Sequence, residues 1–455
     1  MPSSVSAASG SLVPRPAQGV LERFLGLFTD VLPGEGSKLL LLTLNVFLIL
    51  TAYYVMKPAR EVLILDQPDG AELKSYAYAA QAVVLLVLVP LYGGLASRLP
   101  RRRLVNVVTV AFIACLPVFF LLAEARASVG FVFFLWIGVF SLMVIAQFWA
   151  YANDVYTPDE GKRLFAVIAF GASSGAVFGS WVSAQLIRAI GVNPLLLVAA
   201  AILAIGLVLF NVIDRRRDAA RPAHAKSDDV PIGTDGAFAL VLRSRYLLLV
   251  ALLVFLLNWV NSAGEYILSS IVKHAADAEV AAGRLSPGDK GRYIGAFFAE
   301  YFEVVNVVGM LLQLFVVSRV VKYLGVPVAL CILPAVSLGS YALAAMAPSL
   351  GVMRWAKTAE NATDYSLMNT VRQMLYLPTT REEKYKAKQV IDSFVVRAGD
   401  VLSAATVYVG TAWLALGVSD FARLNIGIVL IWLVVAVLAG LEFNRRLKLR
   451  QEAGA

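Results

Sequence analysis

Charged side chains occur inside long apolar stretches of this sequence, and the most regular set lies in a stretch near residue 360. Its five members are spaced three, three, four and eight residues apart: Arg354, Lys357, Glu360, Asp364 and Arg372. On a helix they share a face roughly 120° wide. An ionisable group in a membrane span costs about 2.5–3.5 kcal/mol on insertion scales, so such groups usually face a cavity. This face, which carries both signs of charge, favours a helix that lines an aqueous path over a helix at the membrane surface.

Polar side chains stand at similar places in other apolar stretches. Lys57 and Arg60 flank Pro58, which removes one backbone donor and favours a kink. Asn261 and Glu265 lie one helical turn apart on a common face. A pair three residues apart in the eleventh apolar run can neutralise its own charges. The candidate substrate-binding residues are Lys57, Arg60, Asn261, Glu265, Arg354, Lys357, Asp364, Arg397 and Asp400.

Composition fixes the class of protein that must hold these side chains. Of the 455 residues, 59% are hydrophobic and 16% are charged, against roughly 25% charged in soluble domains. This excludes a soluble enzyme and a disordered chain. Two cysteines in apolar runs, two histidines in polar connections and no P-loop argue against a metal site, a disulfide framework, a bound cofactor and ATP hydrolysis. No cluster with catalytic spacing points to an enzyme.

Twelve apolar runs follow one another, six before and six after a polar connector. They predict an all-α membrane protein with twelve transmembrane helices in two pseudo-repeated six-helix bundles, a plan that resembles the major facilitator architecture. The expected divisions are an N-terminal segment with a short amphipathic helix (1–35), a first bundle (36–213), a linker (214–245), a second bundle (246–444) and a tail (445–455).

The two halves resemble each other in sequence. Residues 59–63 (AREVL) match 263–267 (AGEYI), and the connector TPDEGKR at 157–163 has a counterpart in PTTREEKYKAK at 378–388. The loop GGLASRLPRRR at 93–103 is similar to a signature of the major facilitator superfamily. The connection around 157–163 supplies the candidate gating residues Asn153, Glu160, Lys162 and Arg163.

Basic residues predict the orientation. With the N-terminus in the cytoplasm, 26 of the 40 basic residues fall on the side of the two termini and 10 on the other side. The positive-inside rule then places both termini in the cytoplasm. This topology accounts for much of the net charge of +9, so no nucleic-acid partner is expected. The short segment before the first span favours a bacterial inner membrane over a plastid membrane.

Three motifs resemble the ATP/ADP translocases of plastids and obligate intracellular bacteria. They are YYVMKPAREVLIL (53–65), FWAYANDVYTPDEGKRLFAVIAFGASSGAVFGS (148–180) and YSLMNTVRQMLYLPTTREEKYKAKQVID (365–392). The resemblance covers nearly the whole chain in order. It implies a carrier that exchanges nucleotides, usually ATP against ADP, and is driven by gradients rather than by hydrolysis.

The resemblance carries over the family's functional charges only in part. The basic residue of the first motif falls on Arg60, whereas the family's glutamate in the fourth span has no acidic counterpart. The glutamate of the seventh span aligns with Asn261, one turn from Glu265. The lysine of the eleventh span aligns with Asp400, one turn after Arg397.

The residues leave three functions open. The leading hypothesis is nucleotide antiport, in which Arg60 and Arg354 contact phosphate and Glu265 and Asp364 are their exchangeable partners. The first alternative is a carrier of another anionic metabolite, with proton coupling through Glu265 or Asp400. The second is a regulatory relative that keeps the fold and has lost transport. The expected partners are an anionic small molecule (ATP, ADP or a related nucleotide) and the lipid bilayer.

Overall fold

The computed structural model describes residues 31–32, 34–219, 237–380 and 383–454, and these residues form helices joined by short loops. The amphipathic helix predicted before residue 32 lies almost entirely outside them. The first half contains α2 (Gly36–Leu65), α3 (Gly70–Arg98), α4 (Arg101–Glu124), α5 (Gly130–Val155), α6 (Pro158–Ile190) and α7 (Leu195–Ala219). The second contains α8 (Ala237–Arg243), α9 (Arg245–Ala281), α10 (Lys290–Phe315), α11 (Val317–Met346), α12 (Leu350–Thr363), α13 (Asn369–Met374), α14 (Lys388–Val390), α15 (Val396–Ala412) and α16 (Val418–Gly454).

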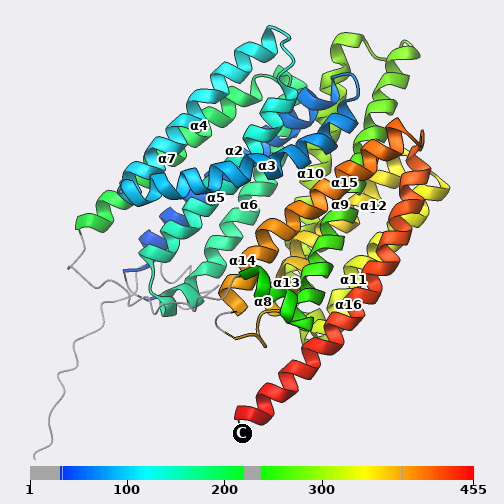
Figure 1. Ribbon diagram of the computed structural model, residues 1–455. Coiled ribbons are helices and arrows are strands. Elements are labelled where there is room, and N and C mark those ends of the chain that lie inside the picture. Colours follow the sequence, from blue (N-terminus) through cyan, green and yellow to red (C-terminus); the bar gives the residue numbers. More distant parts are fainter. Residues whose placement is uncertain (1–30, 33, 220–236, 381–382, 455) are drawn as a thin grey trace, which may run out of the picture.

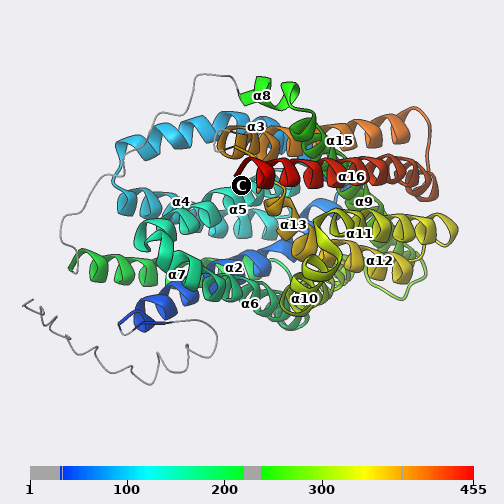
Figure 2. The ribbon, with the colours of Figure 1, turned by 90° about the horizontal axis from the view of Figure 1, so that it is seen from below.

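The helices form two bundles that stand side by side, α2–α7 and α9–α16 (Figures 1 and 2). We call the end that carries α8 and the close of α16 the terminal end, and the opposite end the far end. The all-helical architecture in two bundles confirms the fold class expected from the apolar runs. At the two ends of the predicted linker (214–245), α7 continues to Ala219 and α8 spans Ala237–Arg243.

Ten helices in the described ranges are long and apolar enough to cross a membrane. The other two apolar runs are divided into shorter helices. In the first, α12 has 14 residues and is followed by the π-helical turn η2 (Asp364–Met368) before α13. In the second, the π-helical turn η4 (Ile391–Val395) precedes α15, which has 17 residues. A π-helical turn adds a residue to the helical ladder and often marks a functional region.

Glycines let the helices within each half approach closely. A methyl group at Gly175 of α6 would lie 2.4 Å from the Phe47 carbonyl oxygen of α2, and one at Gly179 would meet the next turn of α2 equally closely. In the second half, a methyl group at Gly399 of α15 would lie 2.8 Å from the Phe255 carbonyl oxygen of α9. Small residues at such crossings allow backbone-to-backbone packing inside a membrane. The first and fifth spans of each half therefore pack in the same way.

Polar contacts join the two halves near the far end. Lys273 donates a hydrogen bond to the Gln67 carbonyl oxygen (2.8 Å), and Tyr266 donates one to Glu72 (3.2 Å). Between described residues, the hydrogen bonds and ion pairs near the terminal end stay within one half or the other. The structure is therefore closed at the far end.

Candidate functional site

A cavity of 610 Å³ lies between the halves, on the terminal side of these contacts. Its wall comes from α2 and α6 of the first half and from α10, α11, η2 and α13 of the second half. Aliphatic and aromatic side chains form most of the lining, together with amides, hydroxyls and small residues. The lining contains no charged residue among the parts of the chain that are described. The side chains that matter below are Tyr54, Tyr365, Asn306, Gln313 and Asn369. A volume of this size is typical of a small-molecule site.

Lys57 lies one helical turn after Tyr54 in α2, on the far-end side of the cavity wall. Its side chain is 7% exposed, and its Nζ lies 4.0 Å from the centroid of the Phe302 ring. The Tyr54 and Tyr365 rings follow at 5.0 Å and 5.9 Å. Within the described part of the chain, its ammonium group forms no hydrogen bond or ion pair. Aromatic faces stabilise a cation weakly, so Lys57 is a buried lysine that no carboxylate of the described chain contacts directly.

Six further ionisable side chains form a buried chain of ion pairs beside Lys57, which we call the charge network. Arg60 contacts Glu61, the next residue of α2. Lys74 of α3 lies 2.7 Å from the other oxygen of Glu61 and 3.2 Å from Glu265 of α9. Lys74 also donates a hydrogen bond to Ser269 (2.9 Å). The network therefore crosses from the first half to the second through Lys74.

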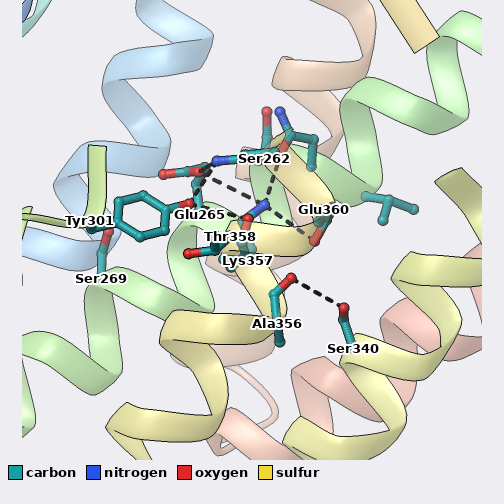
Figure 3. A network of polar contacts seen from close by, with 12 residues as sticks. Ser262, Glu265, Ser269, Tyr301, Ser340, Ala356, Lys357, Thr358 and Glu360 are labelled. Carbon is teal, nitrogen blue, oxygen red and sulfur yellow. Dashed lines mark hydrogen bonds and ion pairs between the residues drawn. The ribbon is translucent and has the colours of Figure 1, made fainter. Parts of the chain in front are cut away.

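The network continues along α12. Lys357, which is fully buried, lies 3.8 Å from Glu265 and 3.3 Å from Glu360, and Figure 3 shows its side chain between the two carboxylates. Lys357 also donates to Asn261 (2.9 Å), and Tyr341 donates to Glu360 (3.0 Å). Buried charges are best tolerated when they are paired and hydrogen-bonded. Every member of the network has an ion-pair partner and at least one hydrogen bond, and the second oxygen of Glu61 is held by its ion pair with Lys74 alone.

The sequence duplication is visible in this network. Glu61 and Glu265 occupy matching positions of the two repeated segments, and both contact the Nζ of Lys74. Lys74 was not among the expected site residues, because it stands at the start of its apolar run and resembles a loop residue by composition. The signal that could have revealed it is the repeated glutamate itself, which requires a buried cation nearby.

Two candidate residues of the eleventh apolar run form a separate pair. Arg397 lies 2.9 Å from Asp400, and Asp400 accepts a hydrogen bond from Ser262 (2.6 Å). This pair joins α15 to α9 inside the second half.

The remaining two candidates of the tenth run are not among the residues that line the cavity. Arg354 lies 3.5 Å from Glu300, whose carboxylate also binds Arg188 of the first half near the far end. Asp364 is the first residue of η2 and is half-buried, without an ion pair to any other described residue. The structure therefore pairs Arg60 with Glu61 and Arg354 with Glu300, and it pairs Glu265 with two lysines.

The candidate gating loop is built by a helix cap. Thr157 accepts a hydrogen bond from the Glu160 backbone (3.3 Å), and the Glu160 carboxylate accepts one from the Thr157 backbone (2.7 Å). Thr380 and Glu383 repeat this reciprocal cap in the second half, at 3.2 Å and 2.9 Å. Two such caps at matching connectors show that the duplicated sequences form the same local structure.

The other gating candidates lie around this cap. Arg163 binds Glu35, just before α2, at 2.9 Å. Burial alone would raise the pKa of Glu35, but the Arg163 guanidinium lowers this pKa below its usual value. Asn153 is exposed at the end of α5, and the side chain of Lys162 lies outside the described part of the structure.

The family model described as Major Facilitator Superfamily matches residues 35–372. The chain belongs to this superfamily. The match begins at the first residue before α2 and runs through both bundles as far as α13, so it includes the cavity and the charge network.

The chain has low sequence identity to individual relatives. It is 24% identical to ADP,ATP carrier protein 1 of Chlamydia trachomatis over 442 residues, covering 80% of each chain, which confirms the resemblance to ATP/ADP translocases. A solved nucleoside transporter, NupG, has a TM-score of 0.59 and 14% identity, with 90% of this chain and 98% of that chain covered. An inward-facing bacterial homologue of the lysosomal transporter Spinster gives 0.60 and 14%, with 90% and 98% covered. These two structures share the fold, and all three relatives are membrane transporters.

Proposed function

We propose that this protein is a secondary transporter that exchanges nucleotides across a membrane by alternating access. The relatives that cover 80% of the chain are named as ADP,ATP carriers, which supports a nucleotide substrate. The observation that carries the proposal is Lys57, a buried cation without an anionic partner in the described chain, beside a cavity of ligand size. A phosphate group supplies the missing charge, because ammonium groups donate strong hydrogen bonds to phosphate.

The cavity can hold both parts of a nucleotide. Tyr54 and Tyr365 present aromatic faces on which a base can stack. Gln313 and Asn369 present amide groups, which can donate to and accept from the edge of a base. With the base held in this wall, the phosphate points toward Lys57. The closed far end then prevents the substrate from passing through until the halves rearrange.

We propose different roles for the other candidate residues. Arg60, Asn261, Glu265 and Lys357 hold the charge network that closes the far end. The residues outside the network and the cavity wall support the helices that rearrange: Arg354, Asp364, Arg397 and Asp400 on the second half, and Asn153, Glu160, Lys162 and Arg163 at the gating loop.

We also propose a location and an orientation. The excess of basic residues on the side of the termini supports an orientation with both ends of the chain in the cytoplasm. The membrane that we propose is a bacterial inner membrane. The cavity then opens toward the cytoplasm in this structure. A reporter that is active only in the cytoplasm, fused to residue 455, tests this orientation. We expect an active reporter, and an inactive one would show that this end lies on the opposite side of the membrane.

The test of function is exchange in proteoliposomes. Purified protein is reconstituted into liposomes loaded with unlabelled adenine nucleotide or left empty, and uptake of labelled AMP, ADP and ATP is measured separately. We expect uptake of at least one nucleotide, and we expect it to require internal nucleotide. Uptake of no nucleotide by folded, monodisperse protein would refute the proposal.

A matched pair of variants links this activity to Lys57. Lys57→Gln removes the buried charge and keeps a similar side-chain length, so exchange should fall by at least about tenfold, which corresponds to 1.4 kcal/mol. Lys322→Gln makes the same change at an exposed position of α11 and should leave exchange unchanged. Equal activity of the two variants would show that Lys57 does not bind the substrate.

A further inference from the structure

The buried charges near the cavity nearly cancel. Four cations meet three carboxylates in this region: Lys57, Arg60, Lys74 and Lys357 against Glu61, Glu265 and Glu360. Only Lys57 is left over, because the network pairs the other three cations. Asp364, half-buried on η2, is a further carboxylate nearby, and its negative charge can only reduce the excess of positive charge. Among the described residues, the site therefore offers at most one uncompensated positive charge.

The described residues of the cavity wall carry no charge. Its polar groups are hydroxyls and amides, such as those of Ser173, Asn306 and Asn369. Asn306 is already engaged, since it donates to Ser180 (3.0 Å). A neutral polar wall can orient a nucleoside, but it cannot balance several negative charges.

Each phosphate added to a nucleotide brings further negative charge into this site. A monophosphate carries about 1.5 to 2 negative charges at neutral pH, which Lys57 and the amide donors can largely satisfy. A diphosphate or triphosphate leaves charge that could be balanced only if Arg60, Lys74 or Lys357 left its carboxylate. That carboxylate would then remain buried without a partner, which is strongly unfavourable.

Given the proposed function, we propose that the site selects nucleotides with a single phosphate group, and that Lys57 and the neutral cavity wall set this preference by charge. The base stacks between Tyr54 and Tyr365, and the single phosphate contacts Lys57. Additional phosphates weaken binding unless a divalent cation neutralises them.

The experiment is an affinity series on the intact purified protein. Binding of adenosine, AMP, ADP and ATP is measured by calorimetry, first in EDTA and then with excess Mg²⁺. In EDTA, AMP should bind best, and ADP should bind at least about tenfold more weakly. Mg²⁺ should recover most of the loss for ADP. Preference for AMP without an effect of Mg²⁺ would indicate selection by size and would overturn the role of charge.

A charge-adding variant tests the same idea in the opposite direction. Asn369 lines the cavity and is exposed there, so Asn369→Lys adds a cation to the cavity wall. A change in the contact of this side chain with the base affects AMP and ADP alike and cancels from their ratio. The ratio of ADP to AMP affinity should rise about tenfold in this variant. Ser128→Lys, in the exposed loop between α4 and α5, adds the same charge outside the cavity and should leave the ratio unchanged.

The outcomes separate this inference from the proposed function. If affinity rises from AMP to ADP to ATP in the absence of metal, the selection for one phosphate is wrong while nucleotide exchange can still stand. If Asn369→Lys leaves the ratio unchanged although the protein is folded, the charge argument is wrong. If no nucleotide binds or is exchanged, the proposed function itself fails.

Discussion

Lys74 should act as the latch that keeps the far end closed. Its ion pair with Glu61 lies within the first half, whereas its contacts with Glu265 and Ser269 cross to the second half. Lys74→Met removes both kinds of contact. The loss of the pair with Glu61 affects the closed and open states alike, so it cancels from the equilibrium between them. Only the contacts that cross between the halves shift that equilibrium.

The magnitude follows from those two contacts. Hydrogen bonds to charged groups contribute about 1.5–3 kcal/mol each. We expect the two contacts together to contribute only about as much as one such bond. The reason is that Glu265 keeps Lys357 and the amide of Asn361 as partners in the variant. A loss of about 2 kcal/mol increases the population of the open state about thirtyfold, since 1.4 kcal/mol corresponds to a factor of ten.

The assay measures access to a buried position between the halves. Val62 is 6% exposed, and one of its methyl carbons lies 3.1 Å from the point where a methyl group on Gly295 of α10 would stand. A cysteine at position 62, with Cys115 and Cys331 replaced by alanine, reacts with maleimide only when the far end opens. Its labelling rate is then proportional to the open population, and it should rise about thirtyfold in Lys74→Met.

Two comparisons make the result decisive. Lys74→Arg retains the charge and should label slowly, and Lys322→Met changes an exposed lysine and should match the parent. If Lys74→Met is folded, with an unchanged elution volume, and still labels at the parent rate, Lys74 does not hold the far end closed. Rapid labelling of all variants would mean that position 62 is accessible in the closed state.

Two further predictions concern the surroundings of the charge network. A methyl group on Gly264 would lie 2.0 Å from the Tyr341 hydroxyl oxygen, so Gly264→Ala should destabilise the protein by about 1–3 kcal/mol in thermal unfolding. Gly339→Ala, with open space around it, should not, and adding Tyr341→Phe should restore part of the loss. The second prediction is that Arg354→Gln changes the free energy of unfolding by less than about 1 kcal/mol, because water screens the partly exposed ion pair with Glu300. A larger destabilisation in thermal unfolding would contradict it.

The sequence predicts the architecture well, because membrane spans are specified by composition over some twenty residues. It also brings out Lys57, Arg60, Glu265 and Lys357 as charges in apolar surroundings, and all four lie beside the cavity or in the network. It misses Lys74, because this lysine stands at the start of its apolar run, whereas α3 already begins at Gly70. Hydropathy locates the end of a span only approximately, and a single lysine there resembles a loop residue.

The pairing of charges cannot be read from spacing. Arg354 and Lys357 lie on one face of α12, yet the first is 29% exposed in its side chain and the second is fully buried. Depth along the helix axis separates them, and depth is set by how α12 packs against its neighbours. The π-helical turn η2 also depends on this packing, because no local sequence motif requires an extra residue in that helix.

The division of charge between the halves indicates how substrate binding can be linked to opening. In the region of the cavity the first half carries Lys57, Arg60 and Lys74 against a single glutamate, and the second half carries one lysine against Glu265 and Glu360. The first half is therefore positive and the second negative. Their attraction adds to the contacts of Lys74 with Glu265 and Ser269 that hold the far end closed. An anion bound at Lys57 reduces the positive excess of the first half and so weakens that attraction. Each half also keeps ion pairs of its own when the halves separate, so no charge in the network is left wholly unpaired in the open state. Opening thus becomes easier when substrate is bound, which is the condition that makes a carrier exchange its substrates rather than return empty.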